Sequence, residues 1–235
     1  MKNSMIYVLV GILALSASCQ QNGKSVKLTS NIDSVSYAIG VLVGSNNLKQ
    51  LESAPGGGDI NKEAMTSAFR VASLGEEAVM TEEQANELVR KFFESAGERE
   101  AQKALEEGNK FLETNKARAG VTTTASGLQY EVITAGTGAM PVATDQVRVH
   151  YHGTLIDGKV FDSSVDRGEP VVFGVNQVIP GWTEALQLMP VGSKWKIYLP
   201  SAIAYGERGA GGDIGPNSVL IFEVELLEIV KPGAE

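Results

Sequence analysis

The spacing of apolar residues changes once along this chain, close to residue 120. Between residues 32 and 119, apolar side chains recur at intervals of three or four positions, which is the period of an amphipathic α-helix. Beyond residue 127, they alternate with polar residues or form short continuous runs, as β-strands do. The pattern predicts an α+β protein, with a helical domain at residues 32–119 and a sheet domain at residues 120–235.

Three helices are predicted in the helical domain, and the third is unusually long. The first helix begins at Asp33 or Ser34, which are suitable N-caps, and the second begins at Asp59. Thr81 and Gln84 have the spacing of a capping box, and the helix that they open continues to the end of the domain. Such a helix is far longer than average, and a domain of about 90 residues built around it has a thin core. We therefore expect this domain to form a homodimer that buries the apolar faces of its helices.

Five strands and one short helix are predicted in the sheet domain. The strands fall at residues 128–133, 147–152, 160–162, 194–199 and 219–227. Residues 120–127 contain glycine and small or β-branched residues that end the helical period, so they mark the domain boundary. A Pro180-Gly181 turn is predicted to place Trp182 in the first turn of the short helix. We expect an antiparallel sheet with this single helix beside it.

The start of the chain resembles a bacterial lipoprotein signal peptide, predicted at residues 1–18. Lys2 precedes an apolar run that is too short to span a bilayer as a helix, and small residues lead to Cys19. In such signals the cysteine becomes the lipidated N-terminus; the alternative is an ordinary secretory signal with an incidental Cys19. Residues 19–31 are polar and predict a flexible tether. Both alternatives predict an exported protein, and lipidation predicts a membrane-anchored lipoprotein in the outer membrane, facing the periplasm.

Composition argues against several classes of function. A net charge of −8 and a sequence pI of about 5.0 disfavour broad contact with nucleic acid. The single cysteine, Cys19, excludes an intrachain disulfide and a cysteine-rich zinc site. The two histidines, His150 and His152, share one face of a predicted strand, where they either bind a metal or form ordinary hydrogen bonds. We expect hydrogen bonds rather than a metal.

The sheet domain lacks the residue orders of the common catalytic sites. It has no Ser-His-Asp order, no reactive cysteine and no phosphate-binding loop. Asp162 directly follows Phe161 at a strand end, and Tyr205 precedes a glycine-rich loop. Trp182 either fills the core or forms the floor of an apolar pocket with a few polar groups. Rotation about a prolyl peptide bond is among the reactions that need only such a pocket.

Five motifs in the sheet domain resemble those of the FKBP-type peptidyl-prolyl isomerases. They are residues 149–155 (VHYHGTL), 158–164 (GKVFDSS), 178–182 (VIPGW), 204–206 (AYG) and 220–226 (LIFEVEL). The helical domain, with SYAIG at residues 36–40 and its long third helix, resembles the dimerisation region of the macrophage infectivity potentiator-like bacterial subgroup. The resemblance implies an FKBP-like twisted antiparallel sheet wrapped on one short helix. It also implies peptidyl-prolyl cis-trans isomerase activity on exported proteins, without a metal or cofactor.

The resemblance assigns roles to the residues of the pocket. Trp182 would be the floor on which the proline ring rests. The Tyr205 hydroxyl and the Ile179 backbone N–H would donate hydrogen bonds to substrate carbonyls. The apolar walls and further substrate contacts would come from Tyr151, Phe161, Phe173, Val178, Ile179, Ile214 and Phe222.

Asp162 would lie at the rim of this pocket. It would face the carbonyl of the twisting amide, or be held by Tyr151 and Arg167. Val171 stands where many members of the family have a phenylalanine, which would widen the pocket and weaken binding of a macrolide inhibitor. We expect activity on proline-containing unfolded or exported polypeptides. The alternative is a chaperone, or holdase, whose dimer holds unfolded chains and whose pocket is mainly a docking site.

Overall fold

The structure, a computed structural model, describes residues 26–230. The predicted signal peptide, Cys19 and most of the predicted tether lie outside these residues. The chain divides into two compact units, and the division falls between Leu48 and Lys49. Among the described residues, no helix combines the length and the apolar character needed to cross a membrane.

The helix α1 (Asn31–Ser53) has no buried residue. Its N-terminus is held by a reciprocal pair of hydrogen bonds, from Asp33 N to Ser30 Oγ at 3.1 Å and from Ser30 N to Asp33 Oδ2 at 2.9 Å. The prediction of Asp33 or Ser34 as the cap is therefore wrong: Ser30 caps the helix, and Asp33 is the carboxylate partner of a capping box. Large apolar side chains remain exposed along the helix, namely Ile32, Val35, Tyr37, Ile39, Val41, Leu42 and Val43.

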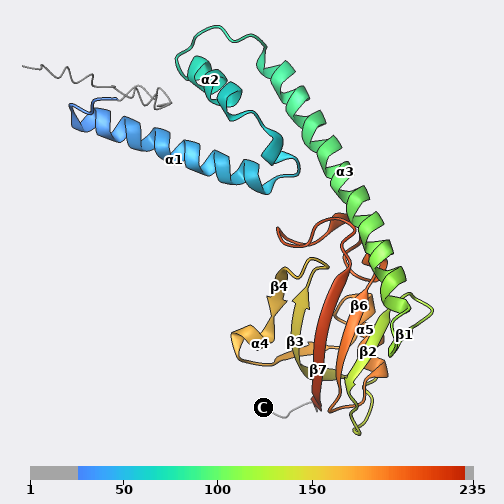
Figure 1. Ribbon diagram of the computed structural model, residues 1–235. Helices are drawn as coiled ribbons and strands as arrows, with labels where there is room; N and C mark the ends of the chain where they lie inside the picture. The colour runs from blue at the N-terminus through green and yellow to red at the C-terminus, as the bar shows by residue number, and fades with distance from the viewer. Residues whose placement is uncertain (1–25, 231–235) are drawn as a thin grey trace, which may run out of the picture. The chain divides into compact units, whose positions relative to one another are not determined.

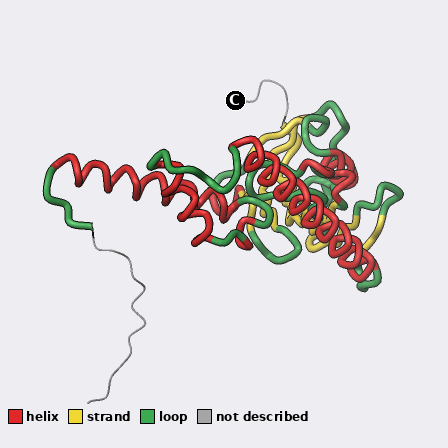
Figure 2. Tube along the Cα trace, turned by 90° about the horizontal axis from the view of Figure 1, so that it is seen from above, coloured by secondary structure: helices red, strands yellow, loops and turns green. Residues whose placement is uncertain are grey.

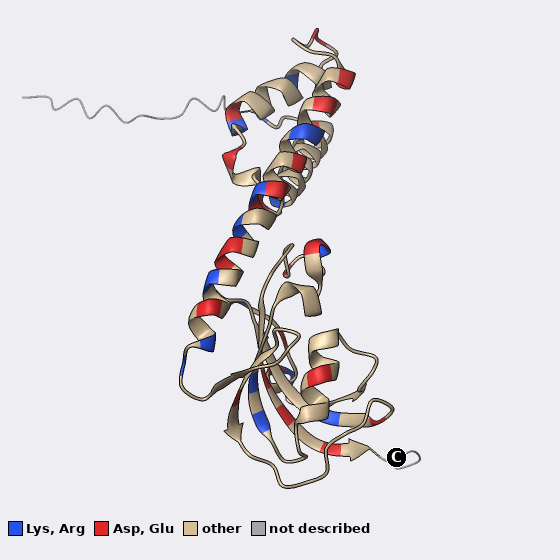
Figure 3. Cartoon of the chain, turned by 90° about the vertical axis from the view of Figure 1, so that its right-hand side faces the viewer, with Lys and Arg blue, Asp and Glu red and all other residues tan. Residues whose placement is uncertain are grey.

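The other two helices of this region are α2 (Lys62–Ser73) and α3 (Glu82–Lys116). The predicted start of α2 at Asp59 is wrong, because Asp59 ends a short 3₁₀ helix, η1 (Gly57–Asp59), and the Asn61 side chain caps α2 instead. The predicted capping box of α3 is confirmed, with Thr81 and Gln84 bonding each other's backbone N–H. Acidic and basic side chains are interspersed along α3 (Figure 3).

The sheet follows α3 in the chain, and every strand among the described residues belongs to it (Figures 1 and 2). Its strands are β1 (Val121–Thr123), β2 (Gln129–Thr134), β3 (Gln146–Thr154), β4 (Val160–Ser163), β5 (Val171–Gly174), β6 (Lys194–Leu199) and β7 (Leu220–Val230). The strand order is β1-β2-β6-β7-β3-β4, with β5 pairing with the first half of β3, and all pairs are antiparallel. The predicted α+β class is confirmed.

Two strands and one helix had no counterpart in the sequence prediction. The strand β1 lies inside the segment predicted only as a boundary, and β5 and the one-turn helix α4 (Ser164–Arg167) lie between predicted strands. Each has only three or four residues, which is too short for a hydrophobic period to be recognised. The positions of the two strands are decided by pairing, because β1 bonds to β2 and β5 bonds to β3.

The helix α5 (Pro180–Leu188) packs on one face of the sheet and completes the core. Trp182, Leu186 and the β7 residue Leu220 are all buried in this core. The predicted Pro180-Gly181 turn is wrong, because both residues belong to the first turn of α5 itself. Proline suits the first helical position, where no N–H is needed. Gly181 is required for close packing, since a Cβ there would lie 2.5 Å from Leu199 Cδ2.

The C-terminal end of α3 packs against the sheet within the second unit. Leu112 of α3 forms a small buried cluster with Tyr198 of β6 and Val219. Beside this cluster, buried Asn115 donates from Nδ2 to Gln129 Oε1 at 2.8 Å, and Gln129 Nε2 donates to the Leu112 carbonyl at 2.9 Å. These hydrogen bonds satisfy two buried amide side chains, which would otherwise be costly to bury.

Candidate active site

A cavity of about 670 Å³ lies between α5, the strands β3, β4, β5 and β7, and the glycine-rich loop before β7. Its size is typical of pockets that bind small molecules or single side chains. All but one of the residues predicted for the pocket line this cavity, namely Tyr151, Phe161, Asp162, Phe173, Val178, Ile179, Trp182, Tyr205, Ile214 and Phe222. The exception is Arg167, which reaches the cavity through its contacts with Tyr151 and Asp162.

Trp182 lies at the base of the cavity and is 4% exposed. Three aromatic rings meet it edge to face: Tyr151, Phe173 and Phe222, with ring centroids 5.5, 5.8 and 5.2 Å from its own. Their planes stand at 87°, 80° and 85° to the indole plane. This edge-to-face geometry is favourable for aromatic pairs. It leaves a flat apolar surface bordered by upright rings.

Phe161 extends this aromatic wall from β4. Its ring meets Phe222 edge to face, with centroids 5.3 Å apart and planes at 88°. Gly153, opposite on β3, makes the arrangement possible, because a Cβ there would lie 2.7 Å from Phe161 Cζ and 2.9 Å from Phe222 Cε1. The sequence prediction missed this supporting role, since Gly153 was noted only as part of a motif. On β5 the cavity is lined by Phe173 and not by Val171.

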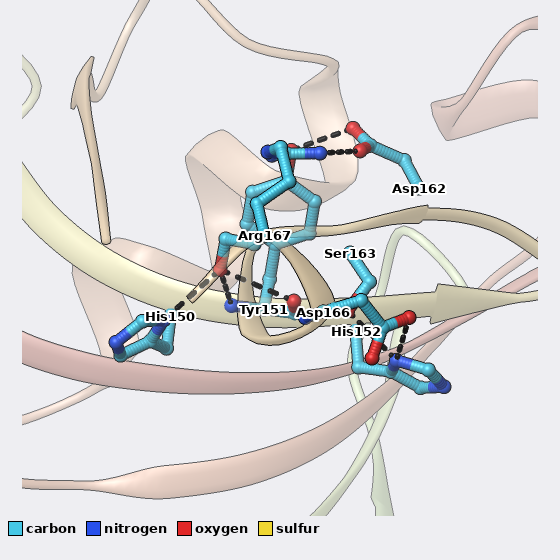
Figure 4. Close-up of polar contacts among 8 residues, drawn as sticks. His150, Tyr151, His152, Asp162, Ser163, Asp166 and Arg167 are labelled. Atoms are coloured by element: carbon cyan, nitrogen blue, oxygen red, sulfur yellow. Dashed lines mark hydrogen bonds and ion pairs between the residues drawn. The ribbon is translucent and has the colours of Figure 1, made fainter. Parts of the chain in front are cut away.

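Tyr151, Asp162 and Arg167 form a closed polar network at the rim (Figure 4). The Tyr151 hydroxyl donates to Asp162 Oδ2 at 2.5 Å, and Arg167 donates from Nη1 to Asp162 Oδ1 and from Nη2 to the Tyr151 hydroxyl at 2.9 Å. Both oxygens of the carboxylate are therefore occupied by donors. Of the two positions predicted for Asp162, the structure has the one in which Tyr151 and Arg167 hold it.

The ionisation of these three groups follows from their contacts. Burial raises the pKa of the Tyr151 hydroxyl, and its hydrogen bond to Asp162 raises it further. Burial alone would raise the pKa of Asp162, but the hydrogen bonds from Tyr151 and Arg167 outweigh it and hold that pKa below the ordinary value of 3.8. The pKa of Arg167 is raised, chiefly by its hydrogen bond to Asp162. At neutral pH the network is thus a neutral tyrosine between two opposite charges.

The two histidines lie next to this network and contact serines (Figure 4). His150 Nδ1 is 3.2 Å from Ser164 Oγ, and His152 Nδ1 is 2.9 Å from Ser163 Oγ. Within residues 26–230, no group of three or more histidine, cysteine, aspartate and glutamate side chains is placed to hold a metal ion. Both histidines make the side-chain hydrogen bonds that the sequence led us to expect.

The loop before β7 forms the remaining side of the cavity. Tyr205 stands at its start with 42% of its surface exposed, whereas Ile214 is buried and pairs with Ala210 through two backbone hydrogen bonds. Asp213 at the cavity mouth forms an ion pair with Lys159, 2.8 Å away. Five further residues line the cavity that the sequence prediction did not assign to the site, namely Gln177, Ala210, Gly211, Gly212 and Asp213, although the glycine-rich loop and Asp213 had been noted as features that would affect the substrate. Four of these lie in a loop rich in glycine, where no side-chain pattern indicates which residues face a cavity.

The site has the features of a binding pocket that acts without covalent chemistry. Its base and walls are aromatic, and its two carboxylates are paired: Asp162 with Arg167 and Tyr151, and Asp213 with Lys159. In addition, none of the hydrogen bonds within residues 26–230 uses the Ile179 N–H, which lies at the N-terminus of α5 beside the cavity. Fold and site together define a class: an antiparallel sheet with one packed helix that presents an aromatic pocket.

Two family profiles match the chain. One, described as "FKBP-type peptidyl-prolyl cis-trans isomerase", matches residues 138–227. The other, described as "Domain amino terminal to FKBP-type peptidyl-prolyl isomerase", matches residues 32–132. The chain belongs to the FKBP-type peptidyl-prolyl cis-trans isomerases. The predicted domain boundary at residue 120 stays a prediction.

Individual relatives share most of the chain. "Outer membrane protein MIP" of Legionella longbeachae is 40% identical over 238 residues, covering 98% of this chain and 99% of the relative. The "FKBP-type 22 kDa peptidyl-prolyl cis-trans isomerase" of Escherichia coli (strain K12) is 50% identical over 198 residues, covering 83% and 94%. The crystal structure of FkpA from Escherichia coli superposes with a TM-score of 0.68 at 35% identity, covering 86% of this chain and 98% of that one.

Proposed function

We propose that this protein accelerates cis-trans rotation of X-Pro peptide bonds in exported polypeptides. The observation that carries the proposal is the aromatic cavity above Trp182, which is bordered by three upright rings and has no nucleophile paired with a base. A pyrrolidine ring is compact and apolar, so it is suited to rest on the indole face. The polar groups at the edge of the cavity then contact the substrate backbone on either side of the proline.

The reaction needs only a change of environment around the amide. The planar peptide bond is resonance-stabilised, and its rotation barrier is about 18–20 kcal/mol. Twisting removes the conjugation and leaves a less polar C–N bond, which an apolar cavity stabilises relative to the planar form. About 7 kcal/mol of such stabilisation would accelerate rotation by roughly five orders of magnitude. The Ile179 N–H and the Tyr205 hydroxyl supply donors for substrate carbonyls in this proposal.

The proposal is tested by comparing the two tryptophans of the chain. Trp182 lies under the cavity, whereas Trp195 is equally buried, stacks on Tyr130 at 4.4 Å and does not line the cavity. In a protease-coupled proline-peptide assay at equal folded fraction, Trp182→Leu and Asp162→Leu should lower kcat/KM at least about tenfold, a loss of about 1.4 kcal/mol in transition-state stabilisation. Trp195→Leu should lower stability and leave kcat/KM unchanged. Wild-type kcat/KM in Trp182→Leu would contradict the proposal.

The same variants separate catalysis from the alternative holdase function. Suppression of aggregation of an unfolded client protein should survive Trp182→Leu if the helical region holds the client. It should be lost together with isomerisation if the client is held only in the pocket. A macrolide inhibitor of this family provides a second probe, because competition with the proline peptide would place both ligands in the cavity above Trp182.

We also propose a homodimer through the helical domain. Its support is the apolar surface that α1 leaves exposed within the described chain, for example Leu42 at 63% and Ile39 at 57% exposure. Burial of such a surface against a second copy would remove apolar area from water. Light scattering on the mature chain should give a dimer, and Ile39→Lys should shift it to monomer. Ile133→Lys, at an exposed apolar position of β2, is the matched control and should leave the dimer intact.

Export and lipidation complete the proposal. The support is the signal-like N-terminus with Cys19, together with a relative named as an outer membrane protein. Mass spectrometry of the mature N-terminus should detect a lipidated Cys19 after removal of residues 1–18. Cys19→Ala should release the protein from the membrane fraction while leaving isomerase activity unchanged. An unmodified N-terminus at another residue would support the ordinary secretory signal instead.

A further inference from the structure

The loop that lines the cavity is attached to α3 by one side chain. We define the pocket loop as residues 205–218, which begins with Tyr205 and includes the lining residue Ile214. Near its end, Asn217 donates from Nδ2 to the backbone carbonyl of Ala101 in α3, at 3.1 Å. The two residues are 116 positions apart in the chain. The long helix therefore contacts the same loop that forms one side of the active site.

Asn217 also fixes the beginning of the pocket loop. Its backbone N–H donates to the Gly206 carbonyl at 2.9 Å, directly after Tyr205. Its φ of 57° is positive, and among residues 26–230 no other non-glycine residue has a positive φ. Asparagine tolerates this left-handed conformation better than most residues. One residue thus closes the loop through its backbone and anchors it to α3 through its side chain.

The backbone of α3 lies unusually close to the end of the pocket loop. A Cβ at Gly108 would lie 2.8 Å from Val219 Cγ2 and 4.0 Å from the Asn217 carbonyl oxygen. One turn further along α3, Leu112 packs with Val219 in the buried cluster described above. Ala101, Gly108 and Leu112 therefore each contact the residues that lead from the pocket loop into β7.

The pocket loop is held locally by the two backbone hydrogen bonds between Ala210 and Ile214 and by a hydrogen bond from Ser218 Oγ to the Gly215 carbonyl at 2.8 Å. It contains four glycines after Arg208, namely Gly209, Gly211, Gly212 and Gly215. Glycine leaves the backbone free to adopt many conformations, so such a loop needs outside contacts to keep one of them. The Lys159–Asp213 pair is half exposed or more at both side chains, and exposed ion pairs contribute little. The contact with α3 is thus the constraint that ties the pocket loop to the long helix.

We propose that Asn217 is a positioning residue of the isomerase, which couples α3 to the pocket loop and so holds Tyr205 and Ile214 against the cavity. The inference rests on the proposed function and goes beyond it, because it makes the helical domain part of the apparatus that shapes the active site. Loss of the Asn217 side-chain anchor leaves Trp182 in place at the base of the cavity. It reduces the fraction of molecules whose pocket loop is able to bind the proline-containing substrate.

Asn217→Gly is the informative variant, because glycine keeps the positive φ and removes only the side-chain anchor. If the competent fraction of the loop falls to about a third, KM for a proline peptide rises about threefold, since apparent affinity scales with that fraction. The turnover number kcat should stay close to wild type. Hydrogen exchange of the amides in residues 206–216 should accelerate, and the thermal midpoint of the sheet domain should stay unchanged.

Two further variants keep the test decisive. Asn217→Asp also tolerates the left-handed backbone, but it replaces the amide donor by an acceptor that faces the Ala101 carbonyl, so its KM should rise at least as much. Arg118→Gln is the matched control: Arg118 lies just after the end of α3, and the variant breaks its hydrogen bonds to Tyr198 and Glu131 of the sheet, away from the pocket loop. Its KM and its loop exchange should equal those of the wild type.

The outcomes separate this inference from the proposed function. No isomerase activity in the wild-type chain would contradict the proposed function itself. An active wild type with unchanged KM and unchanged loop exchange in both Asn217 variants would overturn the positioning role. An equal rise of KM in Arg118→Gln would also overturn it, because general docking of α3 would then be responsible. A rise confined to the Asn217 variants supports the inference.

Discussion

Buried side chains are concentrated in the sheet that follows α3, whereas within residues 26–230 the helices α1 and α2 bury none. The sheet and α5 enclose an apolar core that includes Trp182, Leu186 and Leu220. The helix α1 instead exposes apolar residues that its sequence pattern predicted to be on a buried face. The difference teaches that a hydrophobic period predicts an apolar surface but does not say what covers it.

The helix α3 combines both situations, because some of its residues are buried and others are exposed. It has four buried residues, Ala96, Gly108, Leu112 and Asn115, and the last three contact the sheet or the residues leading into β7. The remainder of α3 is stabilised by local features, such as its capping box and the i,i+4 ion pairs Arg90–Glu94 and Lys91–Glu87. We therefore expect substitutions in the two regions to have different consequences.

The largest difference is expected between Leu220→Ala in the sheet and Ile39→Ala in α1. Leu220 is fully buried, so its truncation should lower the free energy of unfolding by about 2–5 kcal/mol at any protein concentration. Ile39 is exposed in the single chain, so its truncation should matter only where a dimer is populated. Urea unfolding followed by tryptophan fluorescence for the sheet, and by circular dichroism for the helices, measures both. A loss of unfolding free energy in Ile39→Ala that does not depend on protein concentration would contradict this expected difference.

A glycine-to-alanine pair should change stability in opposite directions. Gly153→Ala places a Cβ against the rings of Phe161 and Phe222, so it should destabilise by about 1–3 kcal/mol and lower kcat/KM by disturbing the cavity wall. Gly97→Ala in α3 meets nothing within 4 Å and should stabilise the helix by about 1 kcal/mol. Thermal unfolding and the peptide assay test the pair. Destabilisation by Gly97→Ala would mean that a second copy of the chain packs there.

Two asparagines of α3 test whether the C-terminal end of this helix docks on the sheet. Asn115→Ala leaves the buried Gln129 side chain without its donor, so it should lower the free energy of unfolding by about 1–3 kcal/mol. Hydrogen exchange near the end of α3 should increase as well. Asn109→Ala, at an exposed position six residues earlier in the helix, should stay within about 0.5 kcal/mol of wild type. Equal effects at the two positions would contradict the docking of α3 described here.

The smallest effect is expected from pH. Asp162 has a lowered pKa, so its contribution is present above the ordinary carboxyl value of 3.8 and is lost only as pH falls below it. Tyr151 has a raised pKa, so its contribution is complete below its ordinary value of 10.0 and is lost only as pH rises beyond that. Isomerase activity should therefore be flat from about pH 5 to pH 9. A step in isomerase activity inside this range would contradict this account of the network.

Much of the pocket was predictable because its residues are large, aromatic and placed in recognisable motifs. Phe161-Asp162, the segment around Trp182 and the β7 residue Phe222 all stand where the sequence placed them. The residues that were missed are small or lie in loops. Gly153 and Gly181 act through the space they leave for neighbours, and no periodicity reveals a contact that is defined by a missing side chain.

The sequence by itself determined the α+β class, the long capped helix and the residue types of the cavity, because these depend on local period and composition. The tertiary structure decided which carboxylate oxygens Arg167 and Tyr151 occupy, and that Pro180 and Gly181 begin a helix rather than a turn. It also decided that Asn217 reaches α3 across 116 positions of the chain. Contacts between distant segments arise only when strands pair and faces pack, so no local pattern can specify them.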